Sequence, residues 1–391
     1  MSSASSSIAF GLVVLLVLGA TASVAVGQIA LGLVVVWAVV RAVREHWRPP
    51  RLGIEGVVLA FLAWAVLMVP FSEEPARSLD GLERFYLLTA MWLVAAEARD
   101  ASRRRVLAFV FVVGGALVAV FGAMLWIADG GIVFRQRLVV VSNAMTSGAL
   151  LMICTLVGVA FASARGVGRR ARSVFVVATC VLALALFMTM TRSALAGCVV
   201  GLLVLVGWRA PRRVWLAVGL SVAGLALVLF AGDLFLPDRL AARLAFDDVV
   251  GGRNTVARVE MWQAGLRMVA ERPVTGFGDV SLGELSRAYY ATPPDRLHGH
   301  LHNDLVQIAV IWGVPGLLLY LAFVGRKLVV LARRRVDFDD AWVAAAAAVV
   351  VGFFVAGFTE WYFGDAEPLL LSSIVFGIGA APIVGRGREE A

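Results

Sequence analysis

Long apolar segments recur along almost the whole chain and are separated by mostly short polar connections. Many of them run for about 17 to 25 residues, the length that an α-helix needs to cross the hydrocarbon core of a bilayer. The pattern predicts an all-α polytopic integral membrane protein with about 12 transmembrane helices, in which residues 1–391 form a single transmembrane domain. Candidate spans lie at residues 8–26, 28–41, 53–70, 85–98, 106–128, 138–163, 174–191, 193–208, 214–232, 303–325, 341–358 and 369–385.

The connections between these segments fall into two alternating classes. One class is rich in arginine and comprises residues 41–51, 99–105, 165–172, 209–213, 326–335 and 386–388; the other comprises residues 71–84, 129–137, 191–193, 232–301 and 359–368. Cytoplasmic loops of membrane proteins carry an excess of Lys and Arg, so the alternation predicts that the arginine-rich class and both termini are cytoplasmic.

The second class includes one connection of unusual length. Residues 233–301 are expected to form a large extracytoplasmic, periplasmic loop between the ninth and tenth helices. Within it, Arg253–Glu271 has helical periodicity, and residues 273–278 have the composition of a turn. The length of this loop is far above that of the usual connection between helices.

Composition supports a membrane protein. Hydrophobic residues make up 61% of the chain and charged residues only 16%, against about 25% charged residues in soluble domains. This excludes a soluble enzyme, a disordered chain and a fibrous protein. The formal net charge of +8 would suggest nucleic acid in a soluble protein, but here the arginines are expected to set the topology.

Two further features of composition carry weaker predictions. The cysteines Cys154, Cys180 and Cys198 lie in apolar runs without metal-type spacing, so we expect small core hydrophobes. Residues 1–7 contain no basic residue, unlike the start of a signal peptide, so the first apolar run is expected to remain as a membrane span.

Three of the four histidines, His298, His300 and His302, lie in the segment HGHLHND, where the large loop meets a new span. A single histidine at such a boundary is often solvated or caps a helix, but a cluster favours function. Histidine can exchange a proton near neutral pH. An alternating His-x-His-x-His run could instead ligate a metal, although no carboxylate or thiol in the segment completes an obvious ligand set.

Arginines and a tryptophan flank this cluster in sequence. Arg192 lies in TMTRSALAG between two apolar runs; a charge at membrane depth indicates function, and a guanidinium suits phosphate oxygens, although a plain interfacial turn is the alternative. Arg258 and Trp262 share one face of the predicted loop helix. Trp262 is expected either to line a sugar or lipid site or to pack on the bilayer surface. Gly276 and Gly278 would let the backbone approach a ligand.

Acidic residues gather in the last connection of the second class. Glu360, Asp365 and Glu367 lie in TEWYFGDAEP, next to a predicted span. We expect them either to lie in a solvated loop or to supply a carboxylate that orients a catalytic arginine or histidine.

Taken together, these segments resemble the O-antigen ligase and polymerase superfamily, which are polytopic enzymes. The segment HLHNDLVQIAVIWGVPGLLLYL resembles the family's His-Asn motif and the Gly-x-Pro-Gly helix that follows it. RVEMWQAGLRMVAERPVTGFGD resembles the preceding Arg-x3-Trp helix and Pro-x2-Gly-x-Gly turn. TMTRSALAG is similar to a family hairpin, with differences at Ser193 and Ala194, and FTEWYFGDAEPLLL is similar to a late acidic segment.

The resemblance implies a GT-C-like helical fold with the active site at the outer leaflet, between the large loop and the bundle. It implies a glycosyltransferase that moves a glycan from an undecaprenyl-diphosphate carrier, in the bacterial inner (plasma) membrane, without a metal or other cofactor. Many relatives carry an acidic residue before the glycine of the Gly-x-Pro-Gly helix, where this chain has Ile311 and Trp312. An acidic helper must then come from Glu360 or Asp365.

By the same resemblance, Arg192 and Arg258 would hold the donor diphosphate. His302 would activate the acceptor hydroxyl or position the leaving diphosphate. Residues implied to bind substrate are His300, Asn303, Trp262, Gly276, Gly278, Glu360 and Asp365. The chemistry is consistent with this implication, because two guanidinium groups can stabilise a departing diphosphate in place of a metal.

Several functions remain open from the sequence. An O-antigen ligase passes the glycan to lipid A-core, and this is the favoured prediction; a polymerase joins repeat units on the carrier lipid, and both share the motifs above. An anion transporter is the third alternative. A transporter should carry polar residues near the midplane on several broken helices, whereas here the unusual groups gather on one side.

Overall fold

The computed structural model describes residues 3–131, 136–209, 253–291, 294, 297–334 and 340–382, and within this part every regular element is a helix. The first half holds α1 (Ser3–Ala22), α2 (Val24–Glu45), α3 (Glu55–Met68), α4 (Pro75–Asp80), α5 (Glu83–Leu88), α6 (Ala90–Glu97), α7 (Ala101–Ala128), α8 (Ala144–Ala162), α9 (Arg169–Met188) and α10 (Arg192–Arg209). The second half holds α15 (Arg253–Glu271), α16 (Leu282–Ser286), α17 (Asp304–Arg333), α18 (Ala341–Ala356) and α19 (Ala366–Ala380). Short 3-10 helices cover Val69–Phe71 and Arg287–Tyr289.

These helices match the prediction of a membrane-spanning bundle. Six described helices are long and apolar enough to cross a membrane: Ser5–Ala22, Val24–Glu45, Ala101–Ala128, Ala144–Ala162, Arg169–Thr189 and Asp304–Arg333. Four shorter apolar helices occupy other predicted spans: Glu55–Phe71, Arg192–Trp208, Ala341–Ala356 and Ala366–Ala380. The predicted span at 214–232 and the first part of the large loop lie outside the described residues. A total of twelve spans therefore stays a prediction.

Several predicted spans differ in their bounds from the structure. The span expected at 28–41 is the longer helix α2, which extends at both ends and reaches Glu45. The span expected at 85–98 is divided into α5 and α6, with Thr89 between them. In the large loop, α15 has the bounds predicted from its helical periodicity.

The centre of the bundle is formed by α18 and α19 with α8, whose side chains are almost all buried. Helix α18 packs against α10 at very short range: a Cβ added to Gly197 would lie 2.4 Å from the Gly352 carbonyl oxygen. Small residues are what allow membrane helices to approach so closely. In contrast, α2, α7 and α9 expose large apolar residues such as Ile29, Leu117 and Val177, as expected of surfaces that face lipid.

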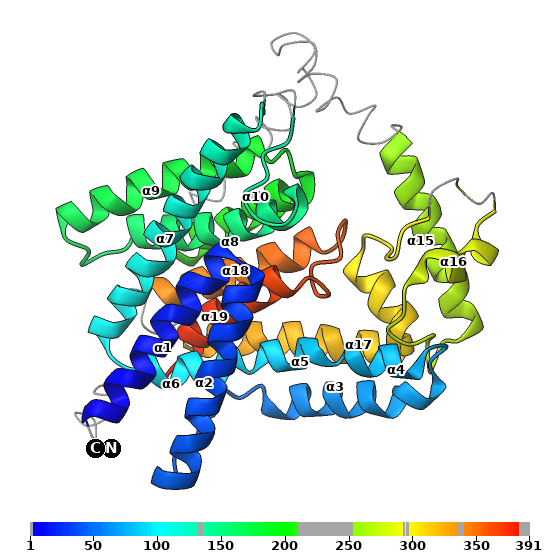
Figure 1. The fold of residues 1–391 in the computed structure, drawn as a ribbon, viewed down its shortest axis with the longest axis horizontal. Helices are drawn as coiled ribbons and strands as arrows, with labels where there is room; N and C mark the ends of the chain where they lie inside the picture. Colours follow the sequence, from blue (N-terminus) through cyan, green and yellow to red (C-terminus); the bar gives the residue numbers. More distant parts are fainter. Residues whose placement is uncertain are drawn as a thin grey trace.

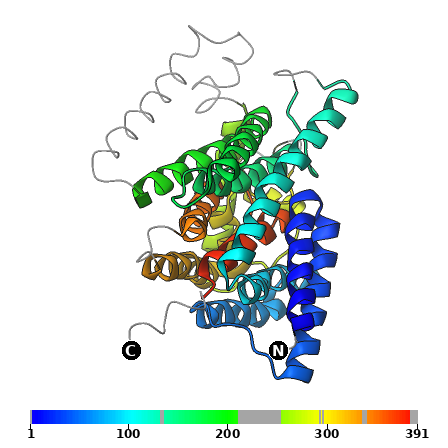
Figure 2. The same cartoon turned by 90° about the vertical axis from the view of Figure 1, so that its left-hand side faces the viewer.

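The bundle has two polar ends. Figure 1 shows α15 and α16 together at one end, opposite the first turn of α1, and Figure 2 shows α1 and α2 lying side by side along one flank. We name the end that carries α15 and the histidine cluster the histidine end. The other, where α2 finishes and α7 and α18 begin, we name the arginine-rich end.

Polar contacts at the arginine-rich end join connections of the arginine-rich class to one another. Glu97 is buried and bonds both Arg41 Nη1 at 2.8 Å and Arg103 Nη1 at 2.6 Å. Arg104 Nη2 donates hydrogen bonds to both carboxylate oxygens of Asp340, at 2.8 and 2.7 Å. The contacts described below at the histidine end likewise join connections of the second class. These contacts are consistent with the predicted alternation; the placement of the loops and the end that faces the cytoplasm stay predictions.

One cysteine departs from the prediction for all three. Cys154 and Cys198 are buried, but Cys180 is exposed on α9. Because α9 presents much of its surface outward, an apolar position on it does not imply a place in the protein core.

The buried ion pairs of Glu97 yield a prediction about stability. Replacing Glu97 by Ala removes the carboxylate that neutralises two neighbouring guanidinium groups, and breaking a buried pair in this way costs about 3–5 kcal/mol. We expect a large drop in the thermal unfolding midpoint of the detergent-purified protein. Glu74→Ala is the matched control, because its pair with Arg77 is exposed and exposed pairs contribute about 0–1 kcal/mol. Equal midpoints for the two variants would show that the buried pairs contribute no more than the exposed one.

Candidate active site

The histidine segment ends at the first turn of α17, where the chain is held in a constrained conformation. His302 adopts a left-handed backbone with φ 49°, which is uncommon for a residue with a side chain and costs free energy. Asn303 follows as the N-cap: its Oδ1 accepts hydrogen bonds from the backbone N–H groups of Leu305 at 2.9 Å and Val306 at 3.0 Å. The cap fixes where the helix begins and therefore where His302 lies.

The two residues that follow His302 also hold the loop between α18 and α19. Asn303 Nδ2 donates to the Phe358 carbonyl at 2.8 Å, and the Asp304 N–H donates to the Gly357 carbonyl at 2.7 Å. Asp304 Oδ1 in turn accepts from the Phe363 N–H at 3.1 Å. The loop that carries Glu360 is therefore fastened at both ends to the residues directly after His302.

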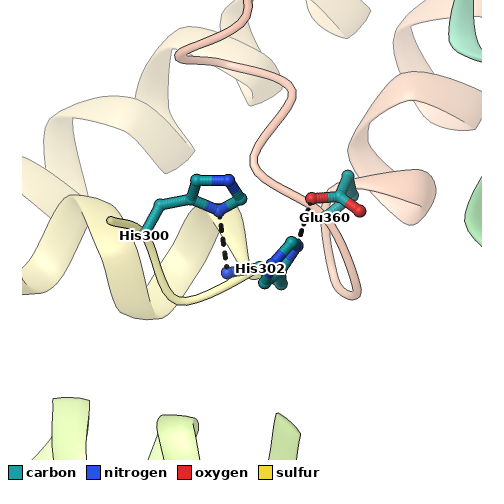
Figure 3. A group of neighbouring side chains, drawn as sticks. All are labelled: His300, His302 and Glu360. Carbon is teal, nitrogen blue, oxygen red and sulfur yellow. Dashed lines mark hydrogen bonds and ion pairs between the residues drawn. The ribbon is translucent and has the colours of Figure 1, made fainter. Parts of the chain in front are cut away.

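Glu360 lies between a histidine and an arginine. Its Oε1 is 2.6 Å from His302 Nδ1, as drawn in Figure 3, and its Oε2 is 3.6 Å from Arg258 Nη2. Its side chain is only 6% exposed, against 12% for His302 and 27% for Arg258. The three charged or titratable groups come from α15, the histidine segment and the α18–α19 loop, so the fold brings together residues far apart in sequence.

The electrostatics of this cluster favour a charged Glu360. Burial alone would raise the pKa of Glu360, but the hydrogen bond with His302 and the charges of His302 and Arg258 outweigh it, and the pKa lies below its ordinary value. An ionised carboxylate can only accept hydrogen bonds. His302 Nδ1 must then carry the proton between them, which leaves Nε2 as the ring nitrogen that can act on a substrate.

His300 has a different environment. Burial, followed by the nearby His302, lowers the pKa of His300 to about 4. Its Nδ1 accepts the His302 backbone N–H at 3.4 Å, and the two rings lie 4.1 Å apart (Figure 3). His300 is therefore neutral at neutral pH and available as a hydrogen-bond partner or a ligand rather than as a charge.

The structure supplies a carboxylate that sequence reasoning did not find for a metal set. Donor atoms of His300, His302 and Glu360 all lie within 4.8 Å of one another. Two imidazoles and a carboxylate are a ligand set that zinc accepts. The group fits a metal ion chemically as well as it fits proton transfer, so metal independence stays a prediction.

Several residues expected to bind substrate make contacts within the protein. Both polar atoms of Asn303 are used in the cap and the loop contact, and the indole N–H of Trp262 donates to the Leu301 carbonyl at 3.0 Å. Trp262 thereby ties α15 to the histidine segment, packing against a small apolar cluster that includes Met268 and Leu301. Whether its ring also lines a sugar or lipid site, or packs on the bilayer surface, stays a prediction.

The turn after α15 docks on α17. Gly276 and Gly278 have φ values of 66° and 87°, and a Cβ on Gly276 would lie 2.5 Å from the Ile311 carbonyl oxygen. Between them, the Phe277 N–H donates to the Val310 carbonyl at 2.8 Å. In the structure these glycines allow a close approach to a protein backbone; the sequence could not tell this from a close approach to a ligand.

This docking depends on a kink in α17. Trp312 and Gly313 leave helical geometry, with Gly313 at φ 69°, and the Val314 N–H donates to the Pro273 carbonyl at 2.8 Å instead of within the helix. The Gly-x-Pro-Gly segment is thus where the large loop attaches to the bundle.

Asp365 and Arg192 lie on the other side of the Glu360 loop. Asp365 Oδ2 accepts from Thr146 Oγ1 at 2.6 Å rather than contacting His302. Arg192 is exposed at the first residue of α10, directly after a left-handed turn at Met190. Its neighbour Ser193 is hydrogen-bonded to the hydroxyl of Tyr362, at 2.9 Å. Of the two candidate carboxylates, Glu360 is the one that meets the histidine and the arginine.

Two residues near the site escaped sequence reasoning. Asp304 appears there only as part of a motif, although its buried carboxylate holds the Glu360 loop. Arg84 was treated as the end of a polar connection, although it is buried and paired with Asp279. A charge directly before an apolar run was the available indication for Arg84, but topology explains such charges equally well.

Asp365 gives a prediction for pH dependence. Burial, reinforced by a hydrogen bond with Glu367, raises the pKa of Asp365 to about 8, from about 3.9 in an unfolded chain. The folded protein therefore prefers the protonated carboxyl. This contribution to the free energy of unfolding is complete below about pH 4 and is lost as the pH rises to about 8.

Asp365→Asn should therefore lose less stability than the wild type between about pH 5 and 8, because an amide does not titrate. Thermal unfolding midpoints of the purified protein across this range measure the difference. Asp129→Asn, at an exposed position, should behave as the wild type. Parallel curves for wild type and Asp365→Asn would contradict the assignment.

Comparison with known families covers the centre of this site. A family model described as O-antigen ligase matches residues 175–321, from α9 into α17. The match includes Arg192, Arg258 and His302, whereas Glu360 lies beyond it. No curated protein matches the chain. The family match confirms the resemblance, predicted from the sequence, to the O-antigen ligase and polymerase superfamily.

Proposed function

We propose that this protein transfers a glycan from an undecaprenyl-diphosphate carrier to an acceptor hydroxyl at the outer face of the bacterial inner membrane, with lipid A-core as the acceptor. The observation that carries the proposal is the shared carboxylate: Glu360 contacts both His302 and Arg258, at 2.6 and 3.6 Å. Family membership of the matched segment supports a transferase of the ligase or polymerase type. The carrier, the acceptor and the residue roles are our proposal.

In this proposal His302 acts as the general base. Its Nδ1–H is held by Glu360, so Nε2 accepts the proton of the acceptor hydroxyl as that oxygen bonds to the anomeric carbon of the donor. The bond between this carbon and the diphosphate oxygen breaks on the opposite face, which inverts the anomeric centre. Glu360 stabilises the imidazolium that forms, in the same way as a carboxylate supports the histidine of a catalytic triad.

In this proposal, Arg258 and Arg192 bind the diphosphate leaving group. Arg258 is 27% exposed and meets Glu360 only at the longer distance of 3.6 Å, so part of its guanidinium can turn toward phosphate oxygens. Arg192 is exposed at the start of α10, where the helix N-terminus also favours an anion. Bidentate guanidinium contacts would stabilise the negative charge that develops on the diphosphate.

Removal of the base tests the proposal most simply. We expect His302→Gln to reduce transfer by about 10²–10⁴-fold, the usual contribution of a general base, and Arg258→Met to cause a comparable loss. The assay uses purified protein and a labelled polyprenyl-diphosphate glycan, with either lipid A-core or a second carrier-linked repeat as acceptor. His46→Gln is the matched control, because His46 is exposed at the end of α2.

The two acceptors separate the alternatives within the family. Product on lipid A-core supports a ligase, and product on the carrier-linked repeat alone would replace it by a polymerase. Full transfer activity in His302→Gln would contradict the mechanism in either case.

Chelation tests metal independence. The proposed mechanism uses His302 and Glu360 for proton transfer and needs no metal ion bound to these residues and His300, so treatment with 1,10-phenanthroline or EDTA should leave the transfer rate unchanged. Loss of activity that added Zn²⁺ restores would assign the same three residues to a zinc site instead.

A further inference from the structure

Arg84 is a buried arginine in the N-terminal half, outside the family match and outside every segment that resembles the family. It lies in α5 at the histidine end, and its side chain is only 11% exposed. A buried guanidinium is costly unless it is paired. What Arg84 contacts therefore indicates why a charge is kept at this place.

Its contacts reach three separate segments. Arg84 Nη1 lies 2.5 Å from Asp279 Oδ2. The guanidinium carbon also lies 5.3 Å from the ring centre of Trp312 and 5.5 Å from that of Trp361. Both distances fall in the range of cation–π contacts, which are strongest for tryptophan and for a desolvated cation.

Each of these three segments carries one residue of the candidate site. Asp279 ends the turn that follows α15, the helix of Arg258. Trp312 lies at the kink of α17, which begins two residues after His302. Trp361 directly follows Glu360. One side chain thus touches every segment that must be aligned for Glu360 to meet both Arg258 and His302.

The connection that carries Arg84 is itself fixed to the turn after α15. The Asp279 N–H donates to Ser78 Oγ at 2.8 Å, and the Glu73 N–H donates to the Phe277 carbonyl at 3.0 Å. Glu73 also forms an ion pair with Arg272. A Cβ on Gly81 would overlap the Asp279 carboxylate. All these contacts involve the segment from Arg272 to Asp279, so the connection that carries Arg84 packs against this turn in particular.

We propose that Arg84 is a positioning residue of the glycan-transfer site. It aligns α15, the kink of α17 and the Glu360 loop by pairing with Asp279 and stacking against Trp312 and Trp361. It does not touch the reacting groups. The inference rests on the proposed function for its kinetic part, and on geometry alone for its structural part.

The structural part is tested by distance measurements between spin labels. Labels attached to Gln263→Cys on α15 and Phe358→Cys on the Glu360 loop, both exposed positions, report how these segments are aligned. The exposed Cys180 is first replaced by Ala. We expect a narrow distance distribution with wild-type Arg84, a broadened one in Arg84→Met, and an unchanged one in Arg77→Met, whose side chain is exposed in the same connection.

The kinetic part uses the transfer assay without labels. Misplacement of catalytic groups by about 1 Å can cost about 100-fold in rate, so we expect Arg84→Met to lower kcat by about that factor. Arg77→Met should retain the wild-type kcat. Arg84→Lys keeps the charge but not the planar group that stacks against Trp312 and Trp361, and its kcat should lie between the two.

The outcomes separate this inference from the proposed function. If the wild-type protein shows no transfer and Arg84→Met still broadens the distance distribution, the positioning role is kept and the proposed function is rejected. Transfer with wild-type kcat and an unchanged distribution in Arg84→Met rejects the inference and keeps the function. If Arg84→Met does not fold, Arg84→Lys decides: wild-type kcat and distribution would overturn the role of the guanidinium.

Discussion

A single buried carboxylate sets the requirements for this end of the molecule. The Glu360 side chain is 6% exposed, and an ionised carboxylate removed from water is tolerated only with compensating charges and hydrogen bonds. Arg258 and His302 provide them. Because these partners come from a loop helix and from the start of a membrane span, the buried carboxylate is stabilised in its charged form only when three segments distant in sequence come together. The contacts that assemble the site are therefore also the contacts that stabilise its buried charge.

Hydrogen bonds to backbone groups hold these three segments together. Asn303 and Asp304 hold the Glu360 loop next to His302, and the kink at Gly313 supplies the exposed carbonyl and N–H groups on which the turn after α15 docks. The left-handed conformation of His302 is the local cost of this arrangement, whereas Gly276 and Gly278 adopt theirs without a Cβ clash. Arg84 then connects the same segments from the opposite side through its side chain. The result is a site built on fixed elements, which catalysis by preorganised groups requires.

Hydropathy predicted most of the fold, because the length and apolar character of a membrane span are local properties of the sequence. The bounds of α15 followed from its periodicity. The division of the fourth span into α5 and α6 did not; both helices pack against α19, a contact that composition does not reveal. Similarly, clustering of histidines was visible in the sequence, and Glu360 was one of two candidate carboxylates, but choosing between Glu360 and Asp365 needed the long-range contacts.

The residues that make protein contacts and are also expected to bind substrate share one property: each has two physical explanations that a sequence cannot distinguish. Glycines at 276 and 278 permit close approach of either a ligand or another backbone. Asn303 can bind a substrate or cap a helix, and Trp262 can stack on a sugar or donate its indole N–H to a carbonyl. A sequence motif identifies the place of such residues without specifying what they contact.

The mechanism requires that Glu360 holds the proton of His302 on Nδ1 and leaves Nε2 for the substrate. Solid-state ¹⁵N NMR of protein labelled at histidine, reconstituted in bilayers, measures this directly, since the chain has only four histidines and the His302 signals are those lost in His302→Gln. We predict a protonated Nδ1 in the wild type, with the Nδ1 signal shifted in Glu360→Gln. An unprotonated Nδ1, or a spectrum insensitive to Glu360→Gln, would contradict this role of the carboxylate.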